Sequence, residues 1–482
     1  MKSIPTVIVV PLLLLAVSFG IAAPPSRAAD DASSSASVLP EDYSCNLCHS
    51  KAGDLWNDET PVVEETKLAG DIHWQRGLRC HDCHGGSPTM DEFQNHREDP
   101  TFRNVLSRSQ IPAFCGHCHS NFEYMRRYTP SARTDQEAEY WTSGHGRHLK
   151  ASIQKADPQE APGSDETTEA DKADKAVATC VDCHGHHGIL AVKDVSSPVY
   201  PTRIAETCAR CHSDEKLMAG RTYNGRPVGH DQYTHWRQSV HGRALMDKGD
   251  LGAPACNDCH GNHGAMPPGV DSVANACGTC HGKIAKLFAD TRMRHKFEEA
   301  GLPGCATCHG SHQTTNPTDE MLGMETGAIC ATCHNPENPQ HGATLAGAEA
   351  ARRMRDNLEQ LKREIVLAEE RIKAAEQLGM EVRGPRFDLR EAVDALTNAR
   401  TLIHSFKVEP LEEALAEGLK VTESVTASAD NALQEHTRRR IWLAASLVPI
   451  LLVVGLLLLY IRTLPPSTGA TAGSDPESIR MD

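Results

Sequence analysis

The stretch CNDCHGNHGAMPPGVDSVANACGTCH, residues 256–281, contains two copies of the pattern Cys-x-x-Cys-His. The pattern occurs nine times and accounts for all 18 cysteines of the 482-residue chain. Disulfides, structural zinc or thioredoxin-like pairs would not require a histidine after every cysteine pair. The cysteines are Cys45 and Cys48, Cys80 and Cys83, Cys115 and Cys118, Cys180 and Cys183, Cys208 and Cys211, Cys256 and Cys259, Cys277 and Cys280, Cys305 and Cys308, and Cys330 and Cys333.

This pattern is the attachment motif of c-type haem. Its two thiols, three positions apart, reach the two vinyl groups at one edge of the porphyrin, and the next residue places its imidazole on the iron. Nine covalently bound haem c groups are therefore expected. Their proximal ligands are predicted to be His49, His84, His119, His184, His212, His260, His281, His309 and His334.

The span from the first motif to the last, residues 45–334 of the haem region 45–341, has about 32 residues per haem, fewer than an independent domain needs. Hydrophobic residues make up 39% of the chain and aromatic residues only 5%. The haems are therefore expected to pack on one another and to replace much of the apolar core. The formal net charge of −15 argues against a nucleic-acid partner, since phosphate binding needs a basic face.

A leading histidine followed by two motifs recurs along the chain, and each such unit is expected to hold two haems. The segment WTSGHGR, residues 141–147, matches WRQSVHGR, residues 236–243, with Trp141 placed opposite Trp236. The Cys45 motif precedes all the units. The units begin at His73, His145, His241 and His295 and end with the motifs of Cys115, Cys208, Cys277 and Cys330, respectively.

The second axial ligands are predicted from the histidines that recur with the motifs. A histidine three residues beyond a proximal histidine cannot easily turn back to the same iron, so it is expected to reach an adjacent haem. The predicted distal ligands are His73, His145, His187, His241, His263, His295 and His312. Candidates for the remaining two irons are His96, His117 and His341, whereas His186, His230 and His235 are expected not to bind.

The stretches SVHGRAL (239–245), CNDCHGNHG (256–264), PPGVDSVANACGTCH (267–281) and CATCHGSH (305–312) resemble large multihaem c-type cytochromes of the cytochrome c3/c7-like, doubled-CxxCH families. The resemblance covers about residues 45–341. It implies closely spaced bis-histidine haems and electron hopping along them. The number of haems and the appended helical segment differ from the simplest members.

Two apolar runs predict targeting and anchoring. Residues 1–28 are predicted to be a secretory signal peptide, with an uncleaved anchor as the alternative, and 29–44 a flexible lead-in. Residues 441–461 carry no charge and are long enough to span a bilayer core of about 30 Å. Export would leave residues 462–482 in the cytoplasm, although Arg438–Arg440 then runs against the positive-inside rule.

Residues 342–440 are predicted to form an antiparallel helical hairpin, coiled coil or three-helix bundle. Apolar residues spaced three and four apart predict a helix over 344–379, and Gly384-Pro385 is expected to break it. A third helix from Leu411 to about His436 is able to continue into the span. The second helix, from about Asp388 to Phe406, is expected to face inward through Leu389, Val393, Leu396, Leu402 and Ile403.

The expected fold is mainly α and irregular: a haem-packed cytochrome c domain, a helical bundle and one transmembrane helix. The expected function is a membrane-anchored nonahaem electron carrier in the bacterial periplasm. Its partners would be a membrane quinol-oxidising or quinone-reducing subunit and another cytochrome or terminal reductase. The sequence does not decide whether the helical segment also forms a homo-oligomer.

The alternative function is a reductase or oxidase of small nitrogen or sulfur compounds, similar to the octahaem tetrathionate, nitrite or hydroxylamine enzymes. Such an enzyme needs one iron with an open axial position, whereas two histidines on every iron leave none. The Cys45 and Cys115 haems have the fewest candidate distal ligands, so they are the candidates for an open site.

Overall fold

The computed structural model describes residues 45, 49, 61–86, 99–155, 177–223, 226–266 and 275–464. The chain divides into two compact units, Met1–Asn104 and Val105–Asp482. The predicted signal peptide, the lead-in, Cys48, His96 and all but the start of the C-terminal tail lie outside the described residues.

The first unit contains three short helices: α2 (Glu65–Gly70), α3 (Ile72–Gln75) and α4 (Cys80–His84). Asp71 begins α3, because its Oδ1 accepts hydrogen bonds from the backbone N–H groups of His73 (2.8 Å) and Trp74 (3.3 Å). Leu68 is buried beside this turn. The cap therefore fixes the orientation of the backbone that carries His73.

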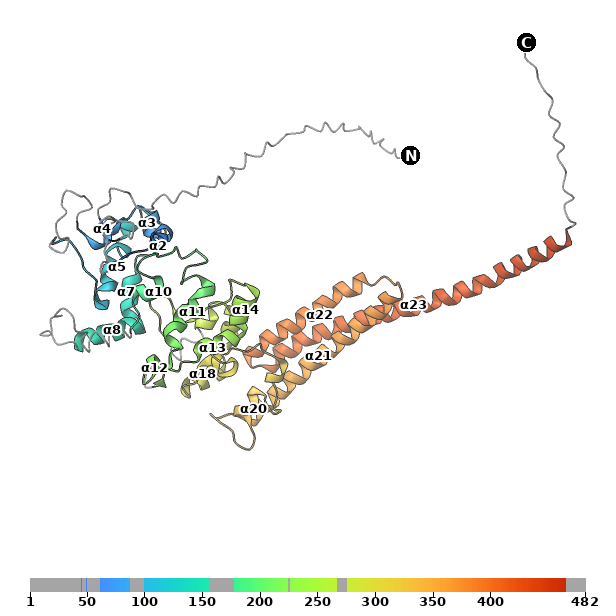
Figure 1. Ribbon diagram of the computed structural model, residues 1–482. Helices are drawn as coiled ribbons and strands as arrows, with labels where there is room; N and C mark the ends of the chain where they lie inside the picture. The colour runs from blue at the N-terminus through green and yellow to red at the C-terminus, as the bar shows by residue number, and fades with distance from the viewer. Residues whose placement is uncertain are drawn as a thin grey trace, which may run out of the picture. The chain divides into compact units, whose positions relative to one another are not determined.

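The haem-motif part of the second unit is built from short helices joined by irregular segments (Figure 1). Among the described residues, strands occur only as the antiparallel pair β1 (Thr222–Tyr223) and β2 (Arg226–Pro227). The helices are η3 (Arg108–Gln110), α5 (Ile111–His119), α6 (Phe122–Met125), α7 (Gln136–Thr142), α8 (Gly144–Lys155), α10 (Cys180–His184), α11 (Pro201–His212), α12 (Glu215–Met218), α13 (Gln232–Gln238), α14 (Val240–Lys248), α15 (Cys256–His260), α17 (Gly282–Ala289), α18 (Arg292–Glu299), α19 (Gly304–His309), η4 (Asp319–Met321) and α20 (Ile329–His334).

Apolar side chains form only small clusters in this part of the chain. One contains Trp236, Leu245, Ala205 and Ala255, and another forms around Leu149. Clusters of this size bury little area compared with an ordinary domain core. The mainly α and irregular fold predicted from the sequence is confirmed.

Three long helices follow: α21 (Leu345–Gln377), α22 (Arg383–Leu402) and α23 (Val408–Thr463), with η5 (Ile403–Ser405) between the last two. They pack side by side as an antiparallel bundle (Figure 1). Their apolar faces meet in two buried clusters, one around Leu358, Leu361 and Leu411 and one around Ile372 and Val425. The predicted three-helix arrangement is therefore present.

Two details of the bundle differ from the sequence prediction. The break falls at residues 378–382, and Pro385 lies in the first turn of α22, where its missing N–H would have no intrahelical partner. Val393 was expected to face inward, but it is 44% exposed, and the neighbouring Ala392 is buried instead.

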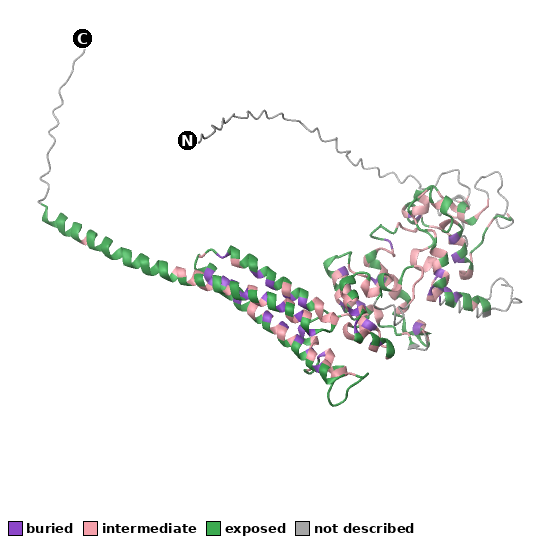
Figure 2. Cartoon of the chain, turned by 180° about the vertical axis from the view of Figure 1, so that it is seen from behind, coloured by how far each residue is buried: buried purple, intermediate pink, exposed green. Residues whose placement is uncertain are grey.

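Helix α23 runs without a break from the bundle through the apolar segment to Thr463. Its buried positions end at Ala429, and the apolar stretch beyond the bundle is exposed (Figure 2). Within the part of the chain that the structure describes, this is the one helix long and apolar enough to cross a membrane, with a window of mean hydropathy 2.7. It is compatible with a membrane anchor.

Candidate functional site: paired histidines beside the cysteine motifs

The first haem motif is held by local capping in the first, second and third repeats. The third residue of the motif is aspartate in these repeats, and its carboxylate accepts a hydrogen bond from the backbone N–H three residues earlier. The Asp182 carboxylate, for example, accepts from the Thr179 N–H at 2.6 Å and is also paired with Arg108. The short helix that carries both cysteines and the proximal histidine is thereby fixed at its start.

A glycine in the left-handed region ends the first motif of each repeat. Gly85, Gly185, Gly261 and Gly310 follow the proximal histidine with φ between +72° and +84°. A side chain is strained at such φ values, so glycine is the residue that fits. The backbone conformation after the proximal histidine therefore explains the glycine that ends the recurring motif Cys-x-x-Cys-His-Gly.

In five pairs of histidines within the described part of the chain, a motif histidine lies beside a second histidine. The ring centres are 5.9–6.4 Å apart. The pairs are His212 with His145, His184 with His263, His281 with His241, His260 with His312, and His309 with His404.

This spacing suits an iron held between two imidazoles. An imidazole nitrogen binds a transition metal at about 2 Å and lies about 1.1 Å from its own ring centre, so the centres of two axial rings are about 6.2 Å apart. The five observed separations lie close to that value. The residues present therefore fit bis-histidine haem, with the cysteines as the covalent attachment points.

Burial favours the neutral form of several of these imidazoles. It lowers the pKa of His145 and of His184 to about 4, with a smaller contribution from the neighbouring histidine of each pair. It also lowers the pKa of His212, His241 and His312. Because the neutral ring is the form that binds a metal, these side chains are in the ligating state at neutral pH.

Backbone carbonyls orient several of the rings. His260 Nδ1 lies 3.1 Å from the carbonyl oxygen of Met266, and His334 Nδ1 lies 3.0 Å from that of Thr344. His49 and His84 make the same type of contact with Pro61 and Arg103. A hydrogen bond at Nδ1 leaves Nε2 as the metal-binding nitrogen.

The pairs follow a rule within the two-haem repeats. The leading histidines His145 and His241 lie beside the second motif of their own repeat, with the rings tilted by 58° and 44°. The histidines three residues beyond a proximal one, His263 and His312, lie beside the first motif of the preceding repeat, with the rings within 13° of parallel. Neighbouring repeats are thereby linked.

The leading histidines are positioned by a cap that the repeats share. The hydroxyl of Ser143 donates to the carbonyl of Tyr140 and accepts from Gly146 N–H, and Ser239 makes the same bonds with Trp236 and Gly242. In both repeats the ligand candidate stands two residues after the serine.

This cap corrects the sequence alignment of the second and third repeats. Tyr140, and not Trp141, occupies the place of Trp236. Both side chains are buried, and both donate to the carbonyl two residues before a motif: Tyr140 OH to Ala178 at 2.9 Å and Trp236 Nε1 to Pro254 at 3.1 Å.

The same cap occurs in the first and fourth repeats with other residues. Asp71 follows the buried Leu68 by three positions, as Thr291 follows the buried Phe288. Two residues after the cap stand His73 in the first repeat and Met293 in the fourth. His295, the predicted ligand of the fourth repeat, is 65% exposed at its side chain and lies 3.7 Å from a Glu298 carboxylate oxygen.

Consecutive motifs of the second unit meet through their cysteines. The Cys180 thiol hydrogen-bonds to that of Cys115, and this contact lowers the pKa of Cys180. The thiols of Cys208 and Cys256, and those of Cys277 and Cys305, are hydrogen-bonded in the same way. In the remaining steps of the series, Cys183 lies near enough to Cys208, Cys259 to Cys280, and Cys308 to Cys330 for the second thiol to add to the effect of burial in raising the pKa of the first.

The remaining predicted residues lie outside the five pairs. His73 Nδ1 is 3.4 Å from Asp71, and the ring of His187 lies against that of His186. His117 lies on α5 two residues before His119, and the backbone of His341 is left-handed at φ +50°. His404 was not predicted. No motif surrounds it in the sequence, so only its place at the turn between two long helices distinguishes it.

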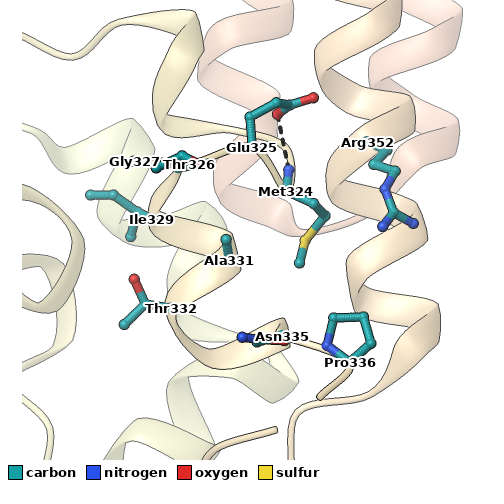
Figure 3. A pocket seen from close by; sticks show the side chains of 11 residues that line it. Met324, Glu325, Thr326, Gly327, Ile329, Ala331, Thr332, Asn335, Pro336 and Arg352 are labelled. Atoms are coloured by element: carbon teal, nitrogen blue, oxygen red, sulfur yellow. Dashed lines mark hydrogen bonds between the residues drawn. The ribbon is translucent and has the colours of Figure 1, made fainter. Parts of the chain in front are cut away.

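A pocket of about 450 Å³ lies beside the last motif, between α20 and the start of α21 (Figure 3). Met324 and Glu325 line it from the preceding loop, and Arg352 lines it from α21. Ala331 and Thr332, the two residues between Cys330 and Cys333, form part of the wall.

The chain matches two known groups of proteins. A model of the cytochrome c3 family matches residues 251–335. The multiheme cytochrome MtrA of Shewanella baltica (strain OS185) is 25% identical over 201 residues, covering 36% of this chain and 53% of the relative. The chain therefore spans about half the length of that relative. No solved structure matches the chain.

Both matches indicate covalently bound haem c, and the multihaem cytochromes as a group point to electron transfer. The cysteine motifs agree with both matches in residue type and spacing. These findings support the assignment of this chain to the multihaem c-type cytochromes.

Proposed function

We propose that this protein is a membrane-anchored, periplasm-facing electron carrier with nine haem c groups. It passes electrons between a quinol-linked membrane partner and a periplasmic or terminal acceptor. The observation that carries the proposal is the set of paired histidines at 5.9–6.4 Å, because an iron with two imidazoles has no position left for a substrate.

The order of the motifs supports a relay. From Cys115 to Cys330, the cysteines of each motif in the second unit are hydrogen-bonded to those of the next motif or lie near enough to influence them electrostatically. The bound haems supply the one-electron chemistry. The chain contributes the axial imidazoles, the fixed spacing and the burial that set the reduction potentials.

The location rests on two features. Covalent attachment of haem to Cys-x-x-Cys-His requires export, which agrees with the predicted signal peptide. The apolar end of α23 is compatible with a single anchor, which would leave residues 462–482 in the cytoplasm. A charge-free span suits an anchor better than a quinone site, so the quinol chemistry is assigned to a separate subunit.

The test is low-temperature EPR of the oxidised, detergent-solubilised full chain, combined with intact-mass measurement of the haem count. A carrier is expected to show nine haems and only low-spin signals, which added cyanide, nitrite or hydroxylamine leave unchanged. A high-spin signal that shifts with one of these ligands would contradict the carrier function and support the alternative, a reductase with one open-site haem.

A further inference from the structure

We propose that His404, at the tip of the helical bundle, is the distal ligand of the haem attached to Cys305 and Cys308, opposite His309. The proposal rests on the proposed haem attachment and deepens it. It makes the bundle part of a haem site, whereas the sequence predicted a helical bundle without a haem ligand.

The geometry of this pair matches that of the others. The ring centres of His309 and His404 are 6.1 Å apart, within the range of the four pairs formed between motif-region histidines. Their planes differ by 24°, which is closer to the near-parallel pairs of His263 and His312 than to the tilted ones. His404 Nδ1 lies 3.1 Å from the Thr401 carbonyl oxygen, so Nε2 is left for a metal.

The repeat rule explains why a ligand from the bundle is needed. The first motif of the second repeat is paired with His263 of the next repeat, and that of the third with His312. The Cys305 motif is the first motif of the fourth repeat, and no repeat follows this one. His404 occupies the position that the next repeat would otherwise fill.

The turn that carries His404 is held firmly. Phe406 has a left-handed backbone at φ +53°, which is strained for a bulky residue and persists only where packing imposes it. Its ring lies 6.2 Å from that of Phe288 on α17, which in turn contacts Phe297 on α18. The Ser405 hydroxyl donates to the Leu402 carbonyl at 2.7 Å and closes the end of α22.

Ion pairs hold the same end of the bundle against the motif region. Arg400 donates two hydrogen bonds to the buried carboxylate of Asp319, at 2.9 and 2.7 Å. Lys283 Nζ, two residues beyond the proximal His281, donates to Asn398 Oδ1 at 3.3 Å. Contacts on both sides of His404 therefore fix its distance from His309.

The test compares His404→Ala, His404→Phe and His404→Met in the full chain, with His436→Ala on α23 as a matched histidine control. The alanine and phenylalanine variants are expected to convert one haem in the protein to high spin, and free imidazole is expected to restore the low-spin signal of the alanine variant. The methionine variant is expected to stay low-spin with one raised reduction potential. The control is expected to keep the wild-type spectrum.

Two results would overturn the assignment. Wild-type low-spin spectra in both the alanine and phenylalanine variants would exclude ligation by His404. High-spin signals that imidazole leaves unchanged would mark a packing role instead. Mass spectrometry of the peptide containing Cys305 and Cys308 separates this failure from that of the proposed function, because a peptide without haem would contradict both.

The shared cap carries a second, independent inference: we infer that Met293 is the distal ligand of the last haem, opposite His334. In the second and third repeats, the residue two positions after the cap lies beside the proximal histidine of the second motif. In the fourth repeat the cap is Thr291, whose hydroxyl donates to Phe288 at 2.7 Å and accepts from Arg294 N–H at 3.1 Å. Met293 is therefore the equivalent residue.

Methionine ligation is distinguishable from histidine ligation by its sulfur-to-iron charge-transfer band in the near infrared and by a higher potential. Met293→Ala is expected to abolish this band, and Met293→His to replace it with a bis-histidine signal. His295→Ala and Met324→Ala, the latter in the pocket beside the motif, are expected to keep the band. Loss of a low-spin signal in His295→Ala, or persistence of the band in Met293→Ala, would overturn the inference.

Discussion

Small side chains at the caps decide where the ligand candidates stand. Gly146 and Gly242 each follow a leading histidine, and each lies against the carbonyl that its cap serine binds. A Cβ on Gly146 would lie 2.0 Å from the Tyr140 oxygen, and one on Gly242 would lie 2.1 Å from the Trp236 oxygen. The backbone must shift to admit it, so the sequence His-Gly-Arg recurs for a steric reason.

Gly242→Ala is therefore expected to lower the stability of the haem region by about 1–3 kcal/mol. It is also expected to perturb the low-spin signal of the haem attached to Cys277, because His241 moves with the helix start. Thermal unfolding followed by haem absorbance measures the first effect, and EPR the second. Gly282→Ala is the control, since nothing lies within 4 Å of a Cβ there; equal behaviour of the two variants would contradict the steric argument.

At the scale of elements, the bundle joins the motif region through one buried charge. Asp319 of η4 is 7% exposed and is paired with Arg400 of α22 and, at 3.6 Å, with Lys362 of α21. The Arg400 hydrogen bonds hold the pKa of Asp319 below its usual value. A depressed carboxyl pKa stabilises the folded state above the unfolded pKa of about 3.9, and this stability is lost as the pH falls through the folded pKa.

Arg400→Ala is expected to weaken this joint by about 1–3 kcal/mol at pH 7, because it removes the two hydrogen bonds that satisfy a buried carboxylate. The loss is expected to shrink as the pH falls below about 4 and to vanish below the depressed folded pKa, where Asp319 is protonated in both proteins. Chemical unfolding of the bundle at pH 7 and at low pH measures it. Arg383→Ala, at an exposed pair with Glu381, is the control, and an equal effect at both sites would rule out this role for Asp319.

The same scale shows what sequence patterns predict and what they miss. The heptad spacing of apolar residues from Ala351 to Ala375 predicts α21, because a helix that is buried on one face has apolar residues at a regular spacing in its sequence. Gly384-Pro385 was misjudged as the break because proline is also accepted in the first turn of a helix. His404 belongs to no regular spacing and to no motif in the sequence. Its neighbour His309 comes close to it only in the folded structure.

The proposed ligand of the fourth repeat differs from the sequence prediction for a related reason. The sequence predicts His295, the nearest histidine, because a sequence pattern records residue type. The position of a ligand relative to the cap depends on the backbone. In the fourth repeat the capping residue is Thr291, whereas in the third repeat it is a serine. The cysteines and proximal histidines were readily located because their spacing is set by the covalent chemistry of haem.

At the scale of the whole molecule, the apolar end of α23 lies outside the helical bundle. The buried residues of α23 end at Ala429, well before the apolar stretch that begins at Ile441. A chain ending after Arg440 is therefore expected to keep its haem spectra and its bundle, and to leave the membrane fraction. Fractionation of cells followed by haem staining measures this, with the full chain as the control. A truncated protein that stays with the membranes would show that another segment anchors it.

The length of the unbroken helix α23 also determines how far the turn at Phe406 lies from the apolar segment. At 1.5 Å per residue, the 33 residues from Val408 to Arg440 extend about 50 Å. If α23 anchors the chain as proposed and stands upright on the membrane, the turn at Phe406 and the Cys305 motif lie far above the lipid surface. A redox partner confined to the bilayer would then not reach the haem of that motif. The protein that exchanges electrons there would have to extend about as far from the membrane, or diffuse freely.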